Sequence, residues 1–163
     1  MSEVVIEAAD FRQVLGAYPT GVSVITAMNA AGQPVGMVVG TFTSVSLDPP
    51  LVGFLPDRKS GTWPQIEAAG HFCVNVLGSD QHALCAQIAG KGDRFAGVEF
   101  SVTNHGLPQL PDVIAAIECR IHSVSDAGDH VFVLGRVLRM AALRDADPML
   151  FHKGRYGGFA TLY

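Results

Sequence analysis

The sequence predicts a mainly β protein, an antiparallel barrel of six or seven strands that carries three short helices. Its two longest strand patterns, residues 113–124 and 130–143, follow one another and are joined by the turn-forming residues 126–129, which predicts a long hairpin. Strand and helix patterns do not alternate, and the GxGxxG motif of dinucleotide-binding sheets does not occur. Antiparallel neighbours without crossover helices favour a barrel over a Rossmann sheet.

Length and composition bound the protein further. A chain of 163 residues has the size of one domain, so residues 1–163 are expected to fold as a single unit. With 48% hydrophobic and 16% charged residues the chain is typical of a compact protein. Its low charge and positive mean hydropathy are also compatible with a surface that a partner subunit covers.

The charge pattern argues against nucleic-acid and membrane partners. The formal net charge is −4, with no basic run, and no apolar stretch approaches the ~18 residues of a membrane span. Residues 1–4 lack the basic and apolar regions of a signal peptide, so we expect a cytoplasmic location.

The elements of the first half follow from caps and turns. Asp10 followed by Gln13 is a capping-box pattern that predicts a helix over residues 12–17. Extended segments are predicted over residues 22–27, 35–46 and 51–55, with a turn over 29–32 between the first two.

The second half is assigned in the same way. Ser60 is an expected N-cap for a helix over residues 62–69 that stops at Gly70, and Ser79 for a helix over residues 80–89. A strand is predicted over residues 72–77, and a short helical turn over 148–151.

The segment from residue 37 to residue 50 is the strongest candidate for a ligand seat. Hydroxyl side chains occur at positions 41, 43, 44 and 46 without any charge, and Pro49 and Pro50 stop the run. Gly40 lies inside this strand pattern, and such a glycine often marks close approach of a ligand or another backbone. The alternative is an ordinary edge strand whose hydroxyls face water and whose Gly40 marks a bulge.

Two cationic loops are candidate phosphate sites. Arg58 and Lys59 directly precede the helix capped by Ser60, whose first turn carries Thr62. A helix start offers free N–H groups and a partial positive charge to a phosphate. Arg94 could hold a phosphate with its planar fork. The alternatives are routine capping for the first loop and a salt bridge from Arg94 to Asp93 or Glu99 for the second.

The C-terminal half adds His130, which follows the hairpin turn, and the glycine-rich cationic segment 152–158. This segment could fold over a nucleotide, or it could be a mobile end, and His130 could be structural. The six histidines show no HxH or HExxH spacing and no thiol pair joins them, so no metal site is expected.

Taken together, these segments resemble the flavin reductase-like family, the small reductase components of two-component flavin-dependent monooxygenases. Residues 44–50, Ser-Val-Ser-Leu-Asp-Pro-Pro, are the most specific match. The other matching pieces cover nearly the whole chain in the family's order: residues 11–12, 20–26, 36–43, 72–77, 93–95, 118–119, 128–130 and 154–156.

The resemblance implies an FMN-binding type of split β-barrel that works as a homodimer. It also implies the reaction: NADH or NADPH gives a hydride to FMN or FAD, and the reduced flavin diffuses to a partner monooxygenase. The cofactor carries that chemistry, so no protein acid–base residue is expected.

The resemblance also assigns residues. Those at 38–41 and 44–47 should border the flavin ring, those at 60, 62 and 94 should hold its phosphate, and His130 and Tyr156 should lie on the nicotinamide side. Where the family pattern has polar side chains, this chain has Val38 and Gly40, so backbone N–H groups are expected to hold the ring there. The whole predicted cofactor-binding set is Val38, Val39, Gly40, Thr41, Ser44, Val45, Ser46, Leu47, Ser60, Thr62, Arg94, Phe95, His130, Arg155 and Tyr156.

Two other functions are compatible with the same fold. One is a flavin-binding protein for electron transfer or storage that has no reductase turnover. The other is a reductase for a different bound cofactor, such as a corrin.

Overall fold

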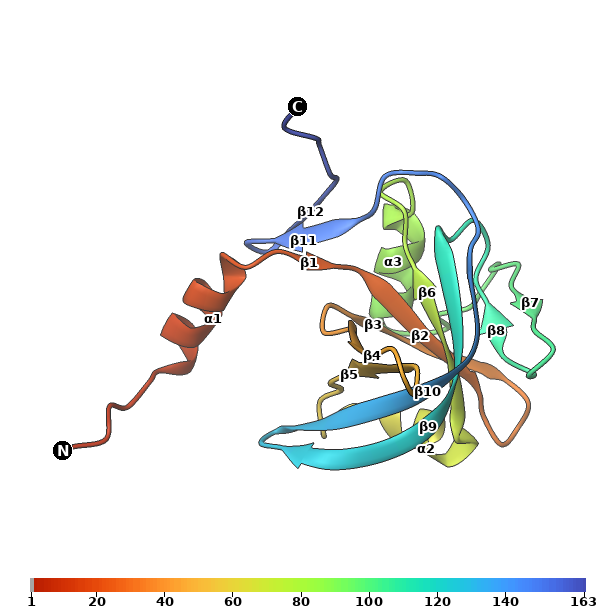
Figure 1. Ribbon diagram of the computed structural model, residues 1–163, viewed down its shortest axis with the longest axis horizontal. Coiled ribbons are helices and arrows are strands. Elements are labelled where there is room, and N and C mark those ends of the chain that lie inside the picture. The colour runs from red at the N-terminus through yellow and green to blue at the C-terminus, as the bar shows by residue number, and fades with distance from the viewer. Residues whose placement is uncertain (1) are drawn as a thin grey trace.

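The computed structural model describes residues 2–163 and consists of three short helices and three antiparallel sheets (Figure 1). The helices are α1 (Ala8–Gly16), α2 (Trp63–Ala69) and α3 (His82–Ala89). The main sheet has seven strands in the order β3-β2-β6-β9-β10-β5-β4. Their bounds are β2 Ser23–Met28, β3 Pro34–Val39, β4 Thr43–Ser46, β5 Leu51–Phe54, β6 His71–Val76, β9 Ala115–Ala127 and β10 His130–Ala142.

Two small sheets accompany the main sheet. β1 (Thr20–Gly21), β11 (Leu150–His152) and β12 (Arg155–Gly157) form one, and β7 (Ser101–Val102) and β8 (Pro108–Gln109) form the other. Across residues 2–163, no helix is long and apolar enough to cross a membrane.

The chain breaks the predicted 35–46 strand in two at residues 40–42. β3 lies at one edge of the seven-stranded sheet and β4 at the other, so three residues carry the chain between the two edges. The sheet must therefore curl until its edges face each other, which makes the split barrel. The predicted barrel class is confirmed, and the single long strand was wrong because its two halves pair with different neighbours, β2 and β5.

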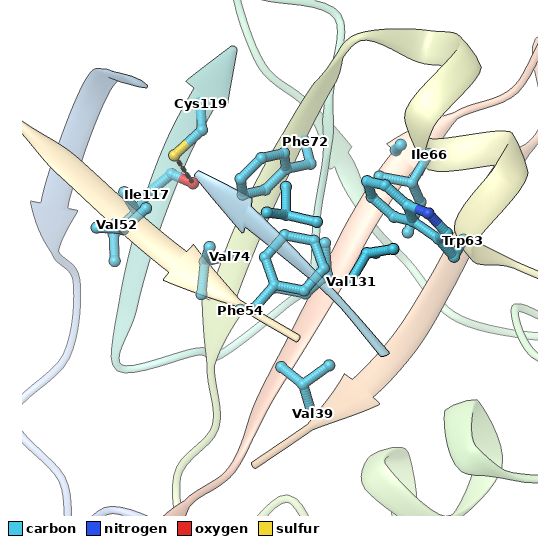
Figure 2. Close-up of a cluster of buried hydrophobic side chains, with 13 residues drawn as sticks. Val39, Val52, Phe54, Trp63, Ile66, Phe72, Val74, Ile117, Cys119 and Val131 are labelled. Atoms are coloured by element: carbon cyan, nitrogen blue, oxygen red, sulfur yellow. Dashed lines mark hydrogen bonds between the residues drawn. The ribbon is translucent and has the colours of Figure 1, made fainter. Parts of the chain in front are cut away.

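The barrel interior is an apolar cluster built around aromatic rings (Figure 2). The ring of Phe54 meets Trp63 and Phe72 edge-to-face, with centroids 5.9 and 5.1 Å apart, a favourable arrangement for aromatic pairs. Trp63 and Ile66 are the buried residues of α2, so this helix closes the barrel with its apolar side.

A second apolar cluster lies on the other face of β2 and β6, under α3. Because successive side chains of a strand point to opposite faces, Ile25 and Val74 enter the barrel while Val24 and Cys73 face the α3 side. These strands are buried on both faces, which fits their mainly apolar sequence.

A buried polar network ties the β7–β8 region to the sheet. The Asn75 side chain donates to Val24 O and to Thr26 Oγ1, and its Oδ1 accepts the Leu110 N–H at 2.8 Å. Thr26 Oγ1 donates in turn to Pro108 O. The two-residue strands of this region have no detectable sequence pattern and were not predicted.

Three local predictions were wrong. α1 begins at Ala8 rather than after Asp10, and its N-cap Glu7 makes no side-chain cap bond. α3 begins after Gln81 rather than at Asp80. In place of the expected helical turn at 148–151, Pro148 forms an isolated bridge with Gly78, and Leu150 and Phe151 lie in β11, where they pair with Gly21 and Thr20.

Gly135 tests the packing of the barrel interior. A Cβ at this strand position would lie 2.5 Å from Cζ of Phe72, a ring that Phe54 already holds in place. We therefore expect Gly135→Ala to lower the free energy of unfolding by about 1–3 kcal/mol, as overpacked core sites do.

Urea unfolding followed by circular dichroism measures this change. The control is Gly157→Ala, also in a strand, where an added Cβ meets nothing within 4 Å. Its unfolding midpoint should stay at the wild-type value. Equal stability of the two variants would contradict the packing described for Phe72.

Candidate functional site

The connection from β5 to α2, residues 55–62 (the 55–62 segment), is the frame of the candidate site, meaning the segment that the other candidate residues contact. Ser60 Oγ accepts the N–H groups of Thr62 and Trp63, both at 3.2 Å. Ser60 thus serves the helix start as predicted. The buried Trp63 fixes this start against the barrel, while Ser60 and Thr62 remain partly accessible.

Arg94 lies at the point where three parts of the chain meet. Its Nη1 donates to Thr62 Oγ1 at 3.0 Å and to Gly36 O of β3 at 3.1 Å, and its Nε donates to Gly90 O at 3.0 Å. Arg94 forms no ion pair with Asp93 or Glu99, the alternative that the sequence left open. Within residues 2–163 its Nη2 makes no hydrogen bond, so this donor is available to a ligand.

A pocket of about 290 Å³ opens at Arg94. Thr62, Gln65 and Gly36 contribute to its wall, and so does Phe95. The Phe95 ring packs directly on β3, since a Cβ on Gly36 would lie 3.1 Å from its Cζ. Helix start, guanidinium and aromatic ring therefore border one cavity, as expected for a site that takes an anionic group beside an apolar one.

The passage from β3 to β4 borders the other side of the site. Val39 is buried in the barrel, Val38 packs toward the α3 cluster, and Gly40 and Thr41 are exposed. Thr41 Oγ1 accepts the Leu55 N–H at 3.0 Å, which ties the passage to the 55–62 segment. The Thr41 hydroxyl keeps its own proton free for a ligand.

Gly40 has a structural reason to be glycine. A Cβ there would lie 2.8 Å from Thr20 Oγ1 of β1. The close approach that the sequence predicted at Gly40 is thus made by the chain itself. Thr20 Oγ1 is buried and has no hydrogen-bond partner among the described residues.

β4 presents a row of unpaired backbone groups. In the described sheet it pairs only with β5, and the register shifts between Ser44 and Ser46, so that Val45 has no partner. Ser44, Val45 and Leu47 are exposed, and no charged residue occurs from Gly40 to Leu47. An uncharged edge with hydroxyl and N–H donors fits the polar rim of a flat heterocycle such as a flavin.

His130 is held at the edge of the same frame. Its Nδ1 lies 2.7 Å from Asp129 Oδ1, and Asp57 of the 55–62 segment pairs with it in an isolated bridge. Arg58 binds the hairpin turn, with its N–H on Asp129 O at 3.0 Å and its Nε on Gly128 O at 2.9 Å. The hydrogen bond with His130 lowers the pKa of Asp129 below its ordinary value.

Arg155 and Tyr156 lie in β12, apart from the 55–62 segment and the residues that contact it. The Tyr156 ring meets His82 of α3 edge-to-face and Phe151 at a tilt, with ring centroids 5.2 and 5.1 Å apart. Partial burial, followed by the neighbouring Cys85 thiol, raises the pKa of Tyr156. Among the described residues, no hydrogen bond or ring contact joins Tyr156 to the other predicted site residues.

The structure thus brings most of the predicted set onto one frame. The 55–62 segment contacts Thr41 through Leu55, the His130 hairpin through Asp57 and Arg58, and Arg94 through Thr62. The sequence did not reveal the roles of Leu55 and Thr20, because a backbone N–H and a buried hydroxyl carry no motif. Arg58 belongs to a loop that the sequence offered as a candidate phosphate site, and its guanidinium binds Gly128 and Asp126 instead.

The chain is similar to characterised proteins over its whole length. The family model of the flavin reductase like domain matches residues 15–160. A flavin reductase from Pseudomonas putida is 49% identical over 99% of this chain and 97% of that protein. An FMN reductase (NADH) from Agrobacterium fabrum is 44% identical over 92% of this chain and 85% of that protein.

Solved structures with a similar fold lead to the same family. Nitrilotriacetate monooxygenase component B from Mycobacterium thermoresistibile superposes with a TM-score of 0.90 at 40% identity, covering 93% of this chain and 86% of that one. The NADH:FAD oxidoreductase of Streptomyces globisporus C-1027, in complex with NAD and FAD fragments, gives 0.89 at 33% identity and covers 98% of both chains. With such matches in both sequence and fold, the chain belongs to the flavin reductase like domain family.

Proposed function

We propose that this protein is an NAD(P)H-dependent flavin reductase that supplies reduced FMN or FAD to a separate monooxygenase. The observation that carries the proposal is that the 55–62 segment joins two parts of the chain: the uncharged passage from β3 to β4, which offers donors for a ring, and the Arg94 pocket, which offers a cation for a phosphate. The names of the relatives, flavin reductase and FMN reductase (NADH), support the same reaction.

Bound flavin would supply the chemistry by accepting a hydride from the nicotinamide. The chain's own residues then have to bind, orient and stabilise. N–H and hydroxyl groups along Thr41–Ser46 would face the polar rim of the ring and favour the negative charge that it gains. No carboxylate occurs from Gly40 to Leu47 to oppose that charge.

The phosphate is assigned to the Arg94 pocket. Arg94 Nη2 and the Thr62 hydroxyl would donate to it, while the bonds of Nη1 and Nε fix the guanidinium in place. Phe95 would then pack beside the flavin. His130, fixed through Asp129 and the 55–62 segment, would lie on the nicotinamide side.

The partner is proposed to be the oxygenase component of a two-component system. Relatives named as reductase subunits of flavin-dependent monooxygenases support this assignment, among them one from Rhodococcus jostii that is 42% identical over 94% of this chain. The proposed working unit is a homodimer and the proposed location is the cytoplasm. Arg155 and Tyr156 keep their predicted place on the nicotinamide side.

The reductase proposal is tested by mixing purified protein with NADH or NADPH and either flavin. We expect oxidation of the nicotinamide, followed at 340 nm, that depends on both protein and added FMN or FAD. Tight flavin binding without oxidation above the uncatalysed rate would instead indicate a storage or electron-transfer protein. Turnover only with a corrin would assign the third function.

His130→Ala tests the nicotinamide side. Because His130 is attached to the frame but not to the phosphate pocket, the variant should lower kcat/KM for NADH about tenfold while FMN affinity stays nearly unchanged. His122→Ala, an exposed histidine on the same hairpin, is the control and should behave as wild type. An unchanged rate in His130→Ala would contradict the assignment.

Thr62→Val tests the phosphate site with nearly equal side-chain volume. Loss of one hydrogen bond to a charged group should weaken FMN binding roughly 10- to 100-fold, as measured by fluorescence titration. Riboflavin, which has no phosphate, should bind both proteins equally. Thr161→Val in the exposed tail is the control, and an equal loss of riboflavin affinity in Thr62→Val would move the phosphate elsewhere.

A further inference from the structure

Glu118 of β9 is the only carboxylate that the fold buries within residues 2–163, with 5% of the residue exposed. A buried charge is costly unless it is paired and hydrogen-bonded. His105 Nδ1 lies 2.5 Å from Glu118 Oε2, whereas Oε1 makes no hydrogen bond in the described part of the chain. One oxygen of this carboxylate is therefore left for a partner from outside the chain.

The unpartnered oxygen is not sealed in the core. Among the described residues, the buried side-chain atoms without a hydrogen bond are Thr20 Oγ1 and Arg144 Nε, and Glu118 Oε1 is not one of them. Glu118 instead lines a pocket of about 220 Å³. This volume is below the ~300–1,000 Å³ of pockets for drug-sized ligands, so the pocket suits a smaller molecule.

The pocket lies between the main sheet and the small β7–β8 sheet. Its floor is formed mainly by β9 and β10, and its other wall by the β7–β8 hairpin. The hairpin is fixed to the main sheet, because Pro108 O accepts from Thr26 Oγ1 and the Leu110 N–H donates to Asn75 Oδ1 at 2.8 Å. The pocket is therefore formed before any ligand binds.

Arg139 of β10 supplies the opposite charge. It is the direct cross-strand partner of Glu118, and it lines the same pocket. Arg139 is exposed and makes no ion pair and no side-chain hydrogen bond within residues 2–163. The pocket thus carries a carboxylate and a guanidinium that are not paired with each other.

Other polar side chains of the pocket are neutral hydrogen-bonding groups. Thr103 and Asn104 line it from the turn between β7 and β8, and Thr103 Oγ1 accepts the Leu107 N–H at 3.2 Å. The Thr103 hydroxyl can still donate its own proton. The pocket therefore favours a small polar molecule over an apolar one.

The set of charged groups selects the class of ligand. A divalent metal would require more ligands, and no group of three or more His, Cys, Asp or Glu residues within 2–163 could hold one. Cys73, which pairs with Glu118 from β6, adds no charge, because burial and then the Glu118 carboxylate raise the pKa of its thiol to about 12. An ammonium group can pair with Glu118, and a carboxylate can pair with Arg139. A molecule that carries both groups is a zwitterion.

We propose that this pocket binds a small neutral amino acid, whose ammonium group contacts Glu118 Oε1 and whose carboxylate contacts Arg139. None of the residues that line the pocket belongs to the predicted flavin-binding set, so this site is separate from the one proposed for flavin. The proposal goes beyond the reductase function and does not rest on it.

The first test titrates the wild-type protein with L-alanine, without flavin or nicotinamide, and follows the backbone amides by NMR. We expect saturable binding with a Kd of about 1 mM, since a ligand of so few atoms has little binding energy. The amides of β7 and of β9 near Glu118 should shift. Propionate lacks the ammonium group and ethylamine lacks the carboxylate, so each should bind at least ~10-fold more weakly.

Glu118→Gln keeps the side-chain volume and an acceptor for His105 but removes the charge. We expect it to weaken L-alanine binding roughly 10- to 100-fold, and Arg139→Gln, at an exposed position, to weaken it about fivefold. Arg120→Gln, which changes an exposed arginine of β9 outside the pocket, is the matched control and should bind as wild type. Circular dichroism checks that each variant is folded.

Absence of saturable L-alanine binding up to about 20 mM, twenty times the expected Kd, would overturn the proposal. Wild-type affinity in Glu118→Gln would overturn it too, as would equal binding of L-alanine and ethylamine. Should Glu118→Gln fail to fold, the weaker binding expected of Arg139→Gln and of propionate tests the same two contacts, and wild-type affinity in Arg139→Gln together with equal binding of propionate would then contradict them.

Discussion

The crossing from β3 to β4 is the constraint on which the rest of the structure depends. Because only residues 40–42 separate the two edge strands, the sheet has to close around the Phe54, Phe72 and Trp63 rings. The same closure brings Thr41 to Leu55 and thereby aligns the 55–62 segment with the passage. The candidate site is a direct product of barrel closure.

Much of the fold was readable from the sequence because its signals are local. The 113–143 hairpin, the Ser60 cap and the Gly70 stop all rest on residues within one or two turns of each other. The split at residues 40–42 was not readable, since it depends on which strands pair across the sheet. Short strands such as β7 and β11 are set by pairing with other segments of the chain, so local sequence propensity does not predict them.

Some residues of the candidate site could also be predicted from local sequence, and others could not. Residue types at 60, 62 and 94 pointed to a phosphate seat, and the structure joins Thr62 and Arg94 by a hydrogen bond. The role of Gly40 was only half predicted, because Thr20, which fills the space, lies twenty residues away. Tyr156 could be assigned from the family alone, and within one chain it packs on α3. Its place beside the nicotinamide stays a prediction.

The bulge at Val45 has a consequence for solubility as well as for binding. A free, uncharged edge strand is a template on which another extended chain can add, the usual start of sheet-to-sheet aggregation. A residue without a partner twists such an edge and interrupts the regular spacing that an incoming strand needs. With Pro49 and Pro50 just beyond it, β4 stays short and irregular. The irregular pairing at Val45 is therefore expected to hinder the addition of another strand to β4, while its backbone N–H groups stay accessible to a small molecule.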